Sequence, residues 1–302
     1  MANGQSGMNT IPTPSATADA PVDDTVFAEM LRQWIAEFYG KIAPLSEESL
    51  DARVRSYMHQ ELLYQEKVRF VLSLLPCLPE AGLDVGSSTG GLSVALAQHG
   101  IAMQGIEPSL PGVEVSRQRA ARLGLRNVFF RQGVGEELPF DNASFDFVIS
   151  LAVLEHVQDV PAVVSEVFRV LKPGGHAYFE VPNNLFPFEG HYKMAWLPMM
   201  PTALAKRYVA MRGAYPAFLD HLHYMSRSII TRHFRNAGFA DCRDVAADFL
   251  VGKAARAPWA NREGRLAGMT WCIPLIRLFF GCRPTAWFLH RAVCLIATKP
   301  RK

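Results

Sequence analysis

The stretch that decides the fold is Leu83-Asp-Val-Gly-Ser-Ser-Thr-Gly-Gly91, a short apolar strand that runs into a glycine-rich turn. A helix is predicted over residues 92–98, and a second strand over residues 101–106, directly before Glu107. This order forms a nucleotide-binding unit, because glycines let the backbone approach a ligand and a helix N-terminus offers free N–H groups.

Three kinds of nucleotide site compete for this turn. A P-loop requires Lys after its last glycine, but Leu92 follows Gly91, so that site is excluded. A dinucleotide fingerprint requires glycine where Ser88 stands. An S-adenosylmethionine site places an acid two residues before the first glycine, and Asp84 occupies that position.

Further motifs follow in a fixed order over roughly residues 80–182. They are Gly105-Ile-Glu107, residues 133–140 followed by residues 144–150, Leu154-Glu-His-Val157, and Arg169-Val-Leu-Lys-Pro-Gly-Gly175. Together with the glycine turn, they resemble the class I S-adenosylmethionine-dependent methyltransferases, and in particular the bacterial enzymes of methyltransferase type 11. The resemblance implies methyl transfer with S-adenosyl-L-methionine as the cofactor.

The resemblance also assigns roles to single residues. Glu107 is expected to accept both ribose hydroxyls, since a carboxylate accepts two hydrogen bonds at once, and Asp84 is expected near the methionine amino group. The other expected cofactor-binding residues line the turn, the adenine and the methionyl side, and are Gly86, Ser88, Gly90, Gly135, Glu136 and Leu151. Two residues depart from the family pattern: Ser88 replaces a central glycine, and Val134 replaces an Asp found in many relatives.

Strands and helices alternate from residue 81 onwards, which predicts an α/β fold. We expect a Rossmann-like, seven-stranded, mostly parallel sheet with helices on both faces, an N-terminal helical layer and an inserted lid. The predicted segments are a disordered tail (1–24), the helical layer (25–80), the cofactor-binding core (81–182), an acceptor-side insertion (183–226) and a C-terminal completion of the core (227–302).

Histidines are the candidate catalytic residues, because a hydroxyl acceptor benefits from a base that takes its proton. The candidates are His156 after the fourth strand, and His191 and His223 in the insertion. Glu155, His156 and Asp159 also resemble the metal-proximal set of some quinone-biosynthesis O-methyltransferases. That spacing fixes no metal geometry, and we assign no metal ligand.

Charge is divided unevenly along the chain. Residues 1–184 hold 13 Lys and Arg against 22 Asp and Glu, whereas residues 185–302 hold 18 against 6. The basic half contains apolar stretches around residues 196–200 and 271–280, with Arg277 and Arg283 nearby. Two interpretations stay open: a covered lid, or peripheral contact with an anionic membrane. Five scattered cysteines and the lack of a secretory signal predict a cytoplasmic protein, with any membrane contact at the inner face.

The sequence favours methyl transfer to a hydroxyl of a small or lipid-linked acceptor, of the sugar, quinone or polyketide type. A nucleic-acid methyltransferase is the first alternative, supported only by the basic half. The fourth strand leads into Ser150-Leu-Ala-Val153 rather than the Asn/Asp-Pro-Pro-aromatic motif of many base methylases, and no basic run with stacking aromatics occurs. The second alternative, a non-catalytic cofactor-binding scaffold, is motivated by Ser88 and Val134.

Overall fold

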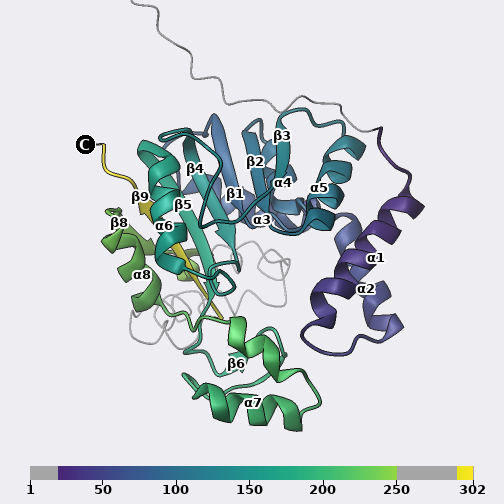
Figure 1. Cartoon of the computed structure of the whole chain (residues 1–302). Helices are drawn as coiled ribbons and strands as arrows, with labels where there is room; N and C mark the ends of the chain where they lie inside the picture. Colours follow the sequence, from purple (N-terminus) through teal and green to yellow (C-terminus); the bar gives the residue numbers. More distant parts are fainter. Residues whose placement is uncertain (1–19, 250–290, 302) are drawn as a thin grey trace, which may run out of the picture.

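The computed structural model describes residues 20–249 and 291–301. Its centre is a seven-stranded sheet in the order β3-β2-β1-β4-β5-β9-β8 (Figure 1). The strands are β1 (Ala81–Val85), β2 (Ala102–Glu107), β3 (Val128–Gln132), β4 (Phe145–Leu151), β5 (Leu171–Pro182), β8 (Ala240–Asp244) and β9 (Ala292–Thr298). Neighbouring strands from β3 to β5 pair in parallel, and β9 pairs antiparallel with both β5 and β8. The predicted seven-stranded, mostly parallel sheet is therefore confirmed.

Helices cover both faces of the sheet. The helices α6 (Val160–Val170) and α8 (Arg227–Asn236) pack one face, while α3 (Gln60–Ser73), α4 (Gly91–Ala97) and α5 (Leu110–Arg122) pack the other. Strand residues such as Leu83 and Phe147 are completely buried, as expected for parallel strands that are covered on both sides.

Two further helices, α1 (Asp24–Gly40) and α2 (Glu47–Met58), extend the molecule at one end (Figure 1). They form a small apolar core of their own around Phe27, Leu31 and Trp34, which packs on Val115 of α5. Both helices begin at a polar N-cap: the side chains of Asp23 and Ser46 accept backbone N–H bonds. The predicted N-terminal layer thus consists of α1, α2 and α3.

The segment after β5 forms the inserted unit. It contains the two-stranded β6 (Phe188–Glu189) and β7 (Met194–Ala195), helix α7 (Thr202–Met211) and a 3₁₀ turn (Pro216–His221), with a core that includes Trp196 and Leu219. Asn184 ties its base together, because its backbone N–H donates to the Met225 carbonyl and its side chain accepts from the Met225 N–H. The insertion follows the carboxyl end of β5, so it reaches the edge of the sheet where ligands bind in open α/β folds.

Some predictions concern residues that the structure does not describe. Residues 1–19 of the predicted tail and the apolar, basic stretch around residues 271–280, with Arg277 and Arg283, lie outside the described residues. Within residues 20–249 and 291–301, none of the helices has the length and apolar character needed to cross a membrane.

Candidate active site

A cavity of about 560 Å³ opens at the carboxyl ends of β1, β2, β4 and β5. Its size lies within the roughly 300–1,000 Å³ that is usual for small-molecule sites. The wall has three sources: the glycine turn and strand ends, the N-terminal helices, and the beginning of the insertion. Residues distant in sequence therefore meet around one space.

The glycine turn supplies the floor of the cavity. Gly86 has φ +79°, and a Cβ atom there would lie 2.4 Å from Val153 Cγ2, so only glycine fits. Ser88 also lines the cavity and holds φ +53°, a left-handed conformation that is strained for serine. Gly90 has φ +76° and packs tightly against Ser116 and Phe130 rather than facing the cavity.

Glu107 organises the turn through both of its carboxylate oxygens. Oε2 accepts the Ser88 N–H at 2.9 Å, and Oε1 accepts the Ser109 N–H at 3.1 Å. Burial raises the pKa of Glu107, and the two backbone hydrogen bonds oppose that rise. Each oxygen keeps one lone-pair site for a ligand hydroxyl. The serine in place of glycine is thus accommodated, because its backbone N–H still reaches the acid.

Asp84 lies in a smaller pocket beside the turn, together with Gln60 and Tyr64 of α3. Its carboxyl is completely buried and accepts the Ser93 hydroxyl at 2.6 Å. Burial raises the pKa of Asp84 to about 7, although the Ser93 hydrogen bond lowers it. A buried carboxyl with one neutral partner is suited to receive a cationic group, because a positive charge would favour its ionised form.

The predicted adenine and methionyl contacts divide into two groups. Leu151 at the end of β4 lines both the cavity and the smaller pocket. Gly135 packs against Val85 and Val163 in the core, and Glu136 accepts the backbone N–H of Gln158 at 2.8 Å. Gly135 and Glu136 are not among the residues that line the cavity, so their contact with adenine stays a prediction.

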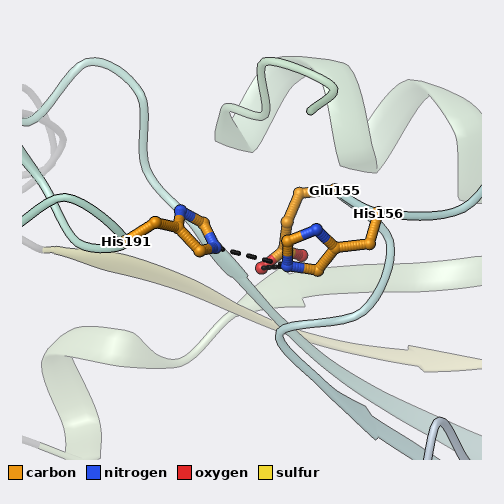
Figure 2. Close-up of side chains that lie close together, drawn as sticks. All are labelled: Glu155, His156 and His191. Atoms are coloured by element: carbon orange, nitrogen blue, oxygen red, sulfur yellow. Dashed lines mark hydrogen bonds and ion pairs between the residues drawn. The ribbon is translucent and has the colours of Figure 1, made fainter. Parts of the chain in front are cut away.

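At the other end of the cavity, Glu155, His156 and His191 come together (Figure 2). The Nε2 atoms of His156 and His191 are 3.2 Å apart, and Glu155 Oε1 is 3.9 Å from His156 Nε2. His191 is oriented by Glu189, whose Oε1 lies 2.6 Å from its Nδ1. Figure 2 shows the two rings turned towards each other with the Glu155 carboxylate beside them.

The protonation of this cluster is set by burial and by Glu189. Burial, together with the neighbouring His191, lowers the pKa of His156 to about 4. Burial alone would lower the pKa of His191, but the hydrogen bond and charge of Glu189 raise it. Burial raises the pKa of Glu155 to about 7. The arrangement therefore favours a neutral His156 beside a His191 that gains protons more readily.

Two other polar residues from the sequence analysis lie elsewhere. His223 Nε2 donates to the Val157 carbonyl at 2.8 Å and does not line the cavity. Asp159 caps helix α6, where its Oδ1 accepts the Ala162 N–H at 3.0 Å. Neither belongs to the cluster of Glu155, His156 and His191.

The N-terminal helices contribute a wall of the cavity that was not predicted from the sequence. Their cavity-lining residues are mostly aromatic: Trp34, Phe38, Tyr39, Tyr57 and Tyr64. The Tyr39 and Tyr57 hydroxyls are 2.8 Å apart, and the Arg53 guanidinium lies 3.8 Å from the Tyr39 ring centroid. The sequence signal for this wall is the high density of aromatic residues between positions 34 and 64. Aromatic residues at helical spacing are usually assigned to a hydrophobic core, so the signal does not predict a cavity.

The cofactor end of the cavity fits S-adenosylmethionine. The backbone at Gly86 offers a cradle that a side chain would fill, and the buried hydroxyl of Ser87 has no hydrogen-bond partner among the described residues. Asp84 offers a carboxyl for a cationic ammonium, and Glu107 offers acceptor sites for hydroxyls. These donors and acceptors match the groups of that cofactor.

Comparison with known sequences agrees with this geometry. Residues 83–179 match the family described as Methyltransferase domain. A ubiquinone biosynthesis O-methyltransferase from Azorhizobium caulinodans is 31% identical over 192 residues, which cover 62% of this chain and 74% of the relative. A protein of the same name from Pseudomonas fluorescens is 37% identical over 126 residues, which cover 38% of this chain and 53% of the relative. With several of these relatives, the chain aligns over only about half of their length.

Solved structures share the fold at low sequence identity. The phosphoethanolamine N-methyltransferase 2 of Haemonchus contortus superposes with a TM-score of 0.54 at 17% identity, over 89% of this chain and 60% of that chain. The YcgJ protein of Bacillus subtilis superposes with a TM-score of 0.50 at 20% identity, over 78% and 98%. From the site, the matched domain and the relatives, we conclude that the chain belongs to the class I S-adenosylmethionine-dependent methyltransferases.

Proposed function

We propose that this enzyme transfers the methyl group of S-adenosylmethionine to a hydroxyl of a small, ring-containing acceptor of the phenolic quinone-precursor type. The observation that carries the proposal is that one cavity is lined both by Glu107 and by the cluster of Glu155, His156 and His191. A methyl donor and a hydroxyl acceptor can meet only if their sites share one space.

The walls of the cavity support a flat, apolar acceptor. The side chains of Trp34, Tyr57 and Leu151 line this cavity. Aromatic rings prefer offset-stacked or edge-to-face contacts, which give about 0.5–1.5 kcal/mol per pair beyond the burial of area. A phenolic ring gains such contacts from Trp34 and Tyr57.

The chain's own residues have clear tasks in such a reaction. Bound S-adenosylmethionine supplies an electrophilic methyl group on a sulfonium. Asp84 and Glu107 hold and orient the donor, and the aromatic wall excludes water and aligns the acceptor, which is the main requirement for a displacement. His156 and His191 line the same cavity, and their task in this proposal is to assist the loss of the proton of the acceptor hydroxyl.

The names of the relatives support the same acceptor class. Several relatives at 31–38% identity are named ubiquinone biosynthesis O-methyltransferases. The alternatives lack comparable support. The backbone N–H of Ser88 still donates to Glu107, so this serine gives less reason to propose a cofactor-binding scaffold without catalysis. The basic stretch that suggested nucleic acid or a membrane lies in part outside the described residues, so peripheral membrane contact stays a prediction.

The test is an acceptor screen with methyl-labelled S-adenosylmethionine and product identification by mass spectrometry. The panel contains an ortho-dihydroxyphenyl compound, its monohydroxy and amino analogues, a sugar and RNA. The expected result is a methyl ether of the phenolic compound. Methylation only of the amine, the sugar or the RNA would overturn the proposal.

A further inference from the structure

The buried carboxylate of Glu155 needs an explanation that the fold does not provide. The residue is 1% exposed, and neither of its carboxylate oxygens has a hydrogen-bond partner among the described residues. Burying a carboxylate without a partner is costly, and such groups are usually paired or bound to a metal. The imidazoles of His156 and His191 lie close to this carboxylate and border the same cavity.

The spacing of the two imidazoles suits a shared ion. Zinc is bound by histidine nitrogen at roughly 2.0–2.1 Å, so two nitrogens at right or tetrahedral angles around one ion lie about 2.8–3.4 Å apart. The observed distance between the His156 and His191 Nε2 atoms is 3.2 Å. One ligand atom from each of Glu155, His156 and His191 lies within 4.8 Å of the others. A small rotation of the unpartnered carboxylate would complete a three-ligand set.

The surroundings of His191 support the same arrangement. Glu189 lies 2.6 Å from Nδ1 of His191 and accepts that N–H, so in the neutral ring the lone pair is on Nε2, which faces Nε2 of His156 at 3.2 Å. Metal-binding histidines usually donate their second nitrogen to a carboxylate in this way. Glu189 is itself buried, and its other oxygen accepts the Tyr192 N–H at 2.7 Å. The orientation of the His191 ring is thus fixed before any ion binds.

We propose that Glu155, His156 and His191 bind one first-row divalent cation, such as Zn²⁺ or Co²⁺, at the acceptor end of the cavity. Two histidines and one carboxylate bind such ions while leaving coordination positions open. In the sequence, the spacing of Glu155, His156 and Asp159 defines no metal geometry. The insertion supplies the missing third ligand, His191, whereas Asp159 is engaged at the α6 N-terminus.

The ion would also act on the acceptor, and this part rests on the proposed function. The open positions face the cavity, because all three ligands line it. An acceptor with two neighbouring ring oxygens can occupy them, which would orient the hydroxyl and lower its pKa. The proton of that hydroxyl would leave to solvent before the methyl group moves from sulfur to oxygen. The cation would further connect the insertion to the end of β4.

The experiment measures binding of Co²⁺ and Zn²⁺ to chelator-treated, full-length protein by calorimetry and by the visible absorption of bound Co²⁺. The variants are Glu155→Gln, His191→Asn and Glu189→Gln, and His233→Asn on α8 is the matched histidine control. We expect one equivalent per chain with a Co²⁺ spectrum of low symmetry. Loss of Glu189 should weaken binding by roughly 10–100-fold, as for other residues behind metal ligands, and loss of a ligand should weaken it further.

Binding that is lost in Glu155→Gln and His191→Asn but kept in His233→Asn supports the site. Absence of binding in the parent protein, or equal binding in all variants, overturns it. Thermal melting and S-adenosylmethionine affinity of each variant show whether it is folded, so a loss of metal binding cannot be confused with unfolding.

The metal site and the proposed function can fail separately. Methylation of the dihydroxyphenyl compound that continues unchanged after complete removal of metal would overturn the metal proposal and leave the acceptor class standing. Stoichiometric binding of the cation to the three named residues, without methylation of any phenol, would keep the site and overturn the acceptor class.

Discussion

The two ends of the cavity are built in different ways. At the cofactor end, Asp84 and Glu107 come from neighbouring strands of one sheet, and each carboxyl has hydrogen-bond partners. At the acceptor end, Glu155 follows β4 while His191 belongs to the insertion, and the Glu155 carboxylate has no hydrogen-bond partner among the described residues. The carboxyls of the first end are fixed by the protein's own hydrogen bonds, whereas the Glu155 carboxylate at the second end is not.

This difference follows from the origin of the residues. Strand ends of a parallel sheet occupy fixed positions, so a motif in sequence places its side chains reliably. The acceptor end depends on a loop, an inserted unit and three N-terminal helices that pack together only in the tertiary structure. Substrate choice can therefore vary at one end while the donor site is retained.

The largest expected effect concerns Arg119, whose side chain connects the glycine turn to the N-terminal helices. Its side chain is 1% exposed and donates to the carbonyls of Thr89 and Tyr57 and to the Glu61 carboxylate. Arg119→Ala leaves that acid unpaired, so we expect a loss of about 3–5 kcal/mol in the free energy of unfolding. Urea titration measures the change.

The exposed Arg117→Ala on the same helix is the control, with an expected loss below about 1 kcal/mol. Equal losses in the two variants would show that Arg119 is not a special link between the glycine turn and the N-terminal helices.

Glu107→Ala tests the cofactor end alone. Loss of a charged hydrogen-bonding group should weaken S-adenosylmethionine binding by about 1.5–3 kcal/mol, which is roughly 10–150-fold in affinity. Calorimetry gives the affinity, with the half-exposed Glu114→Ala on α5 as the control. An unchanged affinity for Glu107→Ala would refute the assignment of the ribose contact.

The sequence predicted the surroundings of the glycine turn more completely than the other side of the cavity. Of the predicted cofactor-binding residues, Gly86, Ser88, Glu107 and Leu151 line the cavity and Asp84 lines the smaller pocket, while their contacts with the cofactor stay predictions. Gly90, Gly135 and Glu136 are not among the residues that line the cavity, because a motif does not state which of its residues face the ligand, and their contacts with the cofactor also stay predictions.

The histidines show why the acceptor end was harder. His156, His191 and His223 were equivalent candidates in sequence, but a backbone carbonyl engages His223 while Glu189 turns His191 towards His156. Contacts between residues 35 positions apart depend on the path of the insertion. The aromatic wall of α1, α2 and α3 escaped prediction for the same reason: core and cavity residues share one helical spacing.

Asp84 gives the cofactor end a pH dependence. Burial raises its folded-state pKa to about 7 from the ordinary 3.8, so at lower pH the empty site holds a proton that the cationic ammonium would displace. Affinity for S-adenosylmethionine should therefore fall by up to about tenfold per pH unit below pH 7 and level off above it. Calorimetry in buffers of different ionisation enthalpy measures the released proton.

Asp84→Asn provides the matched comparison for this titration, because the amide keeps the shape of the side chain and cannot ionise. Its affinity should be weaker at pH 8 and nearly independent of pH. A pH dependence identical to that of the parent protein would assign the effect to another group.

Ser88→Gly has the smallest expected effect and the opposite sign. Glycine adopts the left-handed conformation of residue 88 without steric cost, so unfolding should require about 1 kcal/mol more free energy. The Ser88 N–H bond to Glu107 involves only the backbone and is kept, so cofactor affinity should not fall. Chemical denaturation checks the stability, and a destabilised variant would mean that the serine side chain has a role of its own.

The most direct test of the account compares the parent protein with His191→Asn in two measurements on the same samples. These are the affinity for S-adenosylmethionine and the rate of methyl transfer to an ortho-dihydroxyphenyl acceptor. We expect unchanged cofactor affinity and a rate about 100-fold lower or more, in line with the loss of a group that assists proton removal. A variant that methylates the acceptor at the parental rate would contradict the claim that the insertion completes the active site.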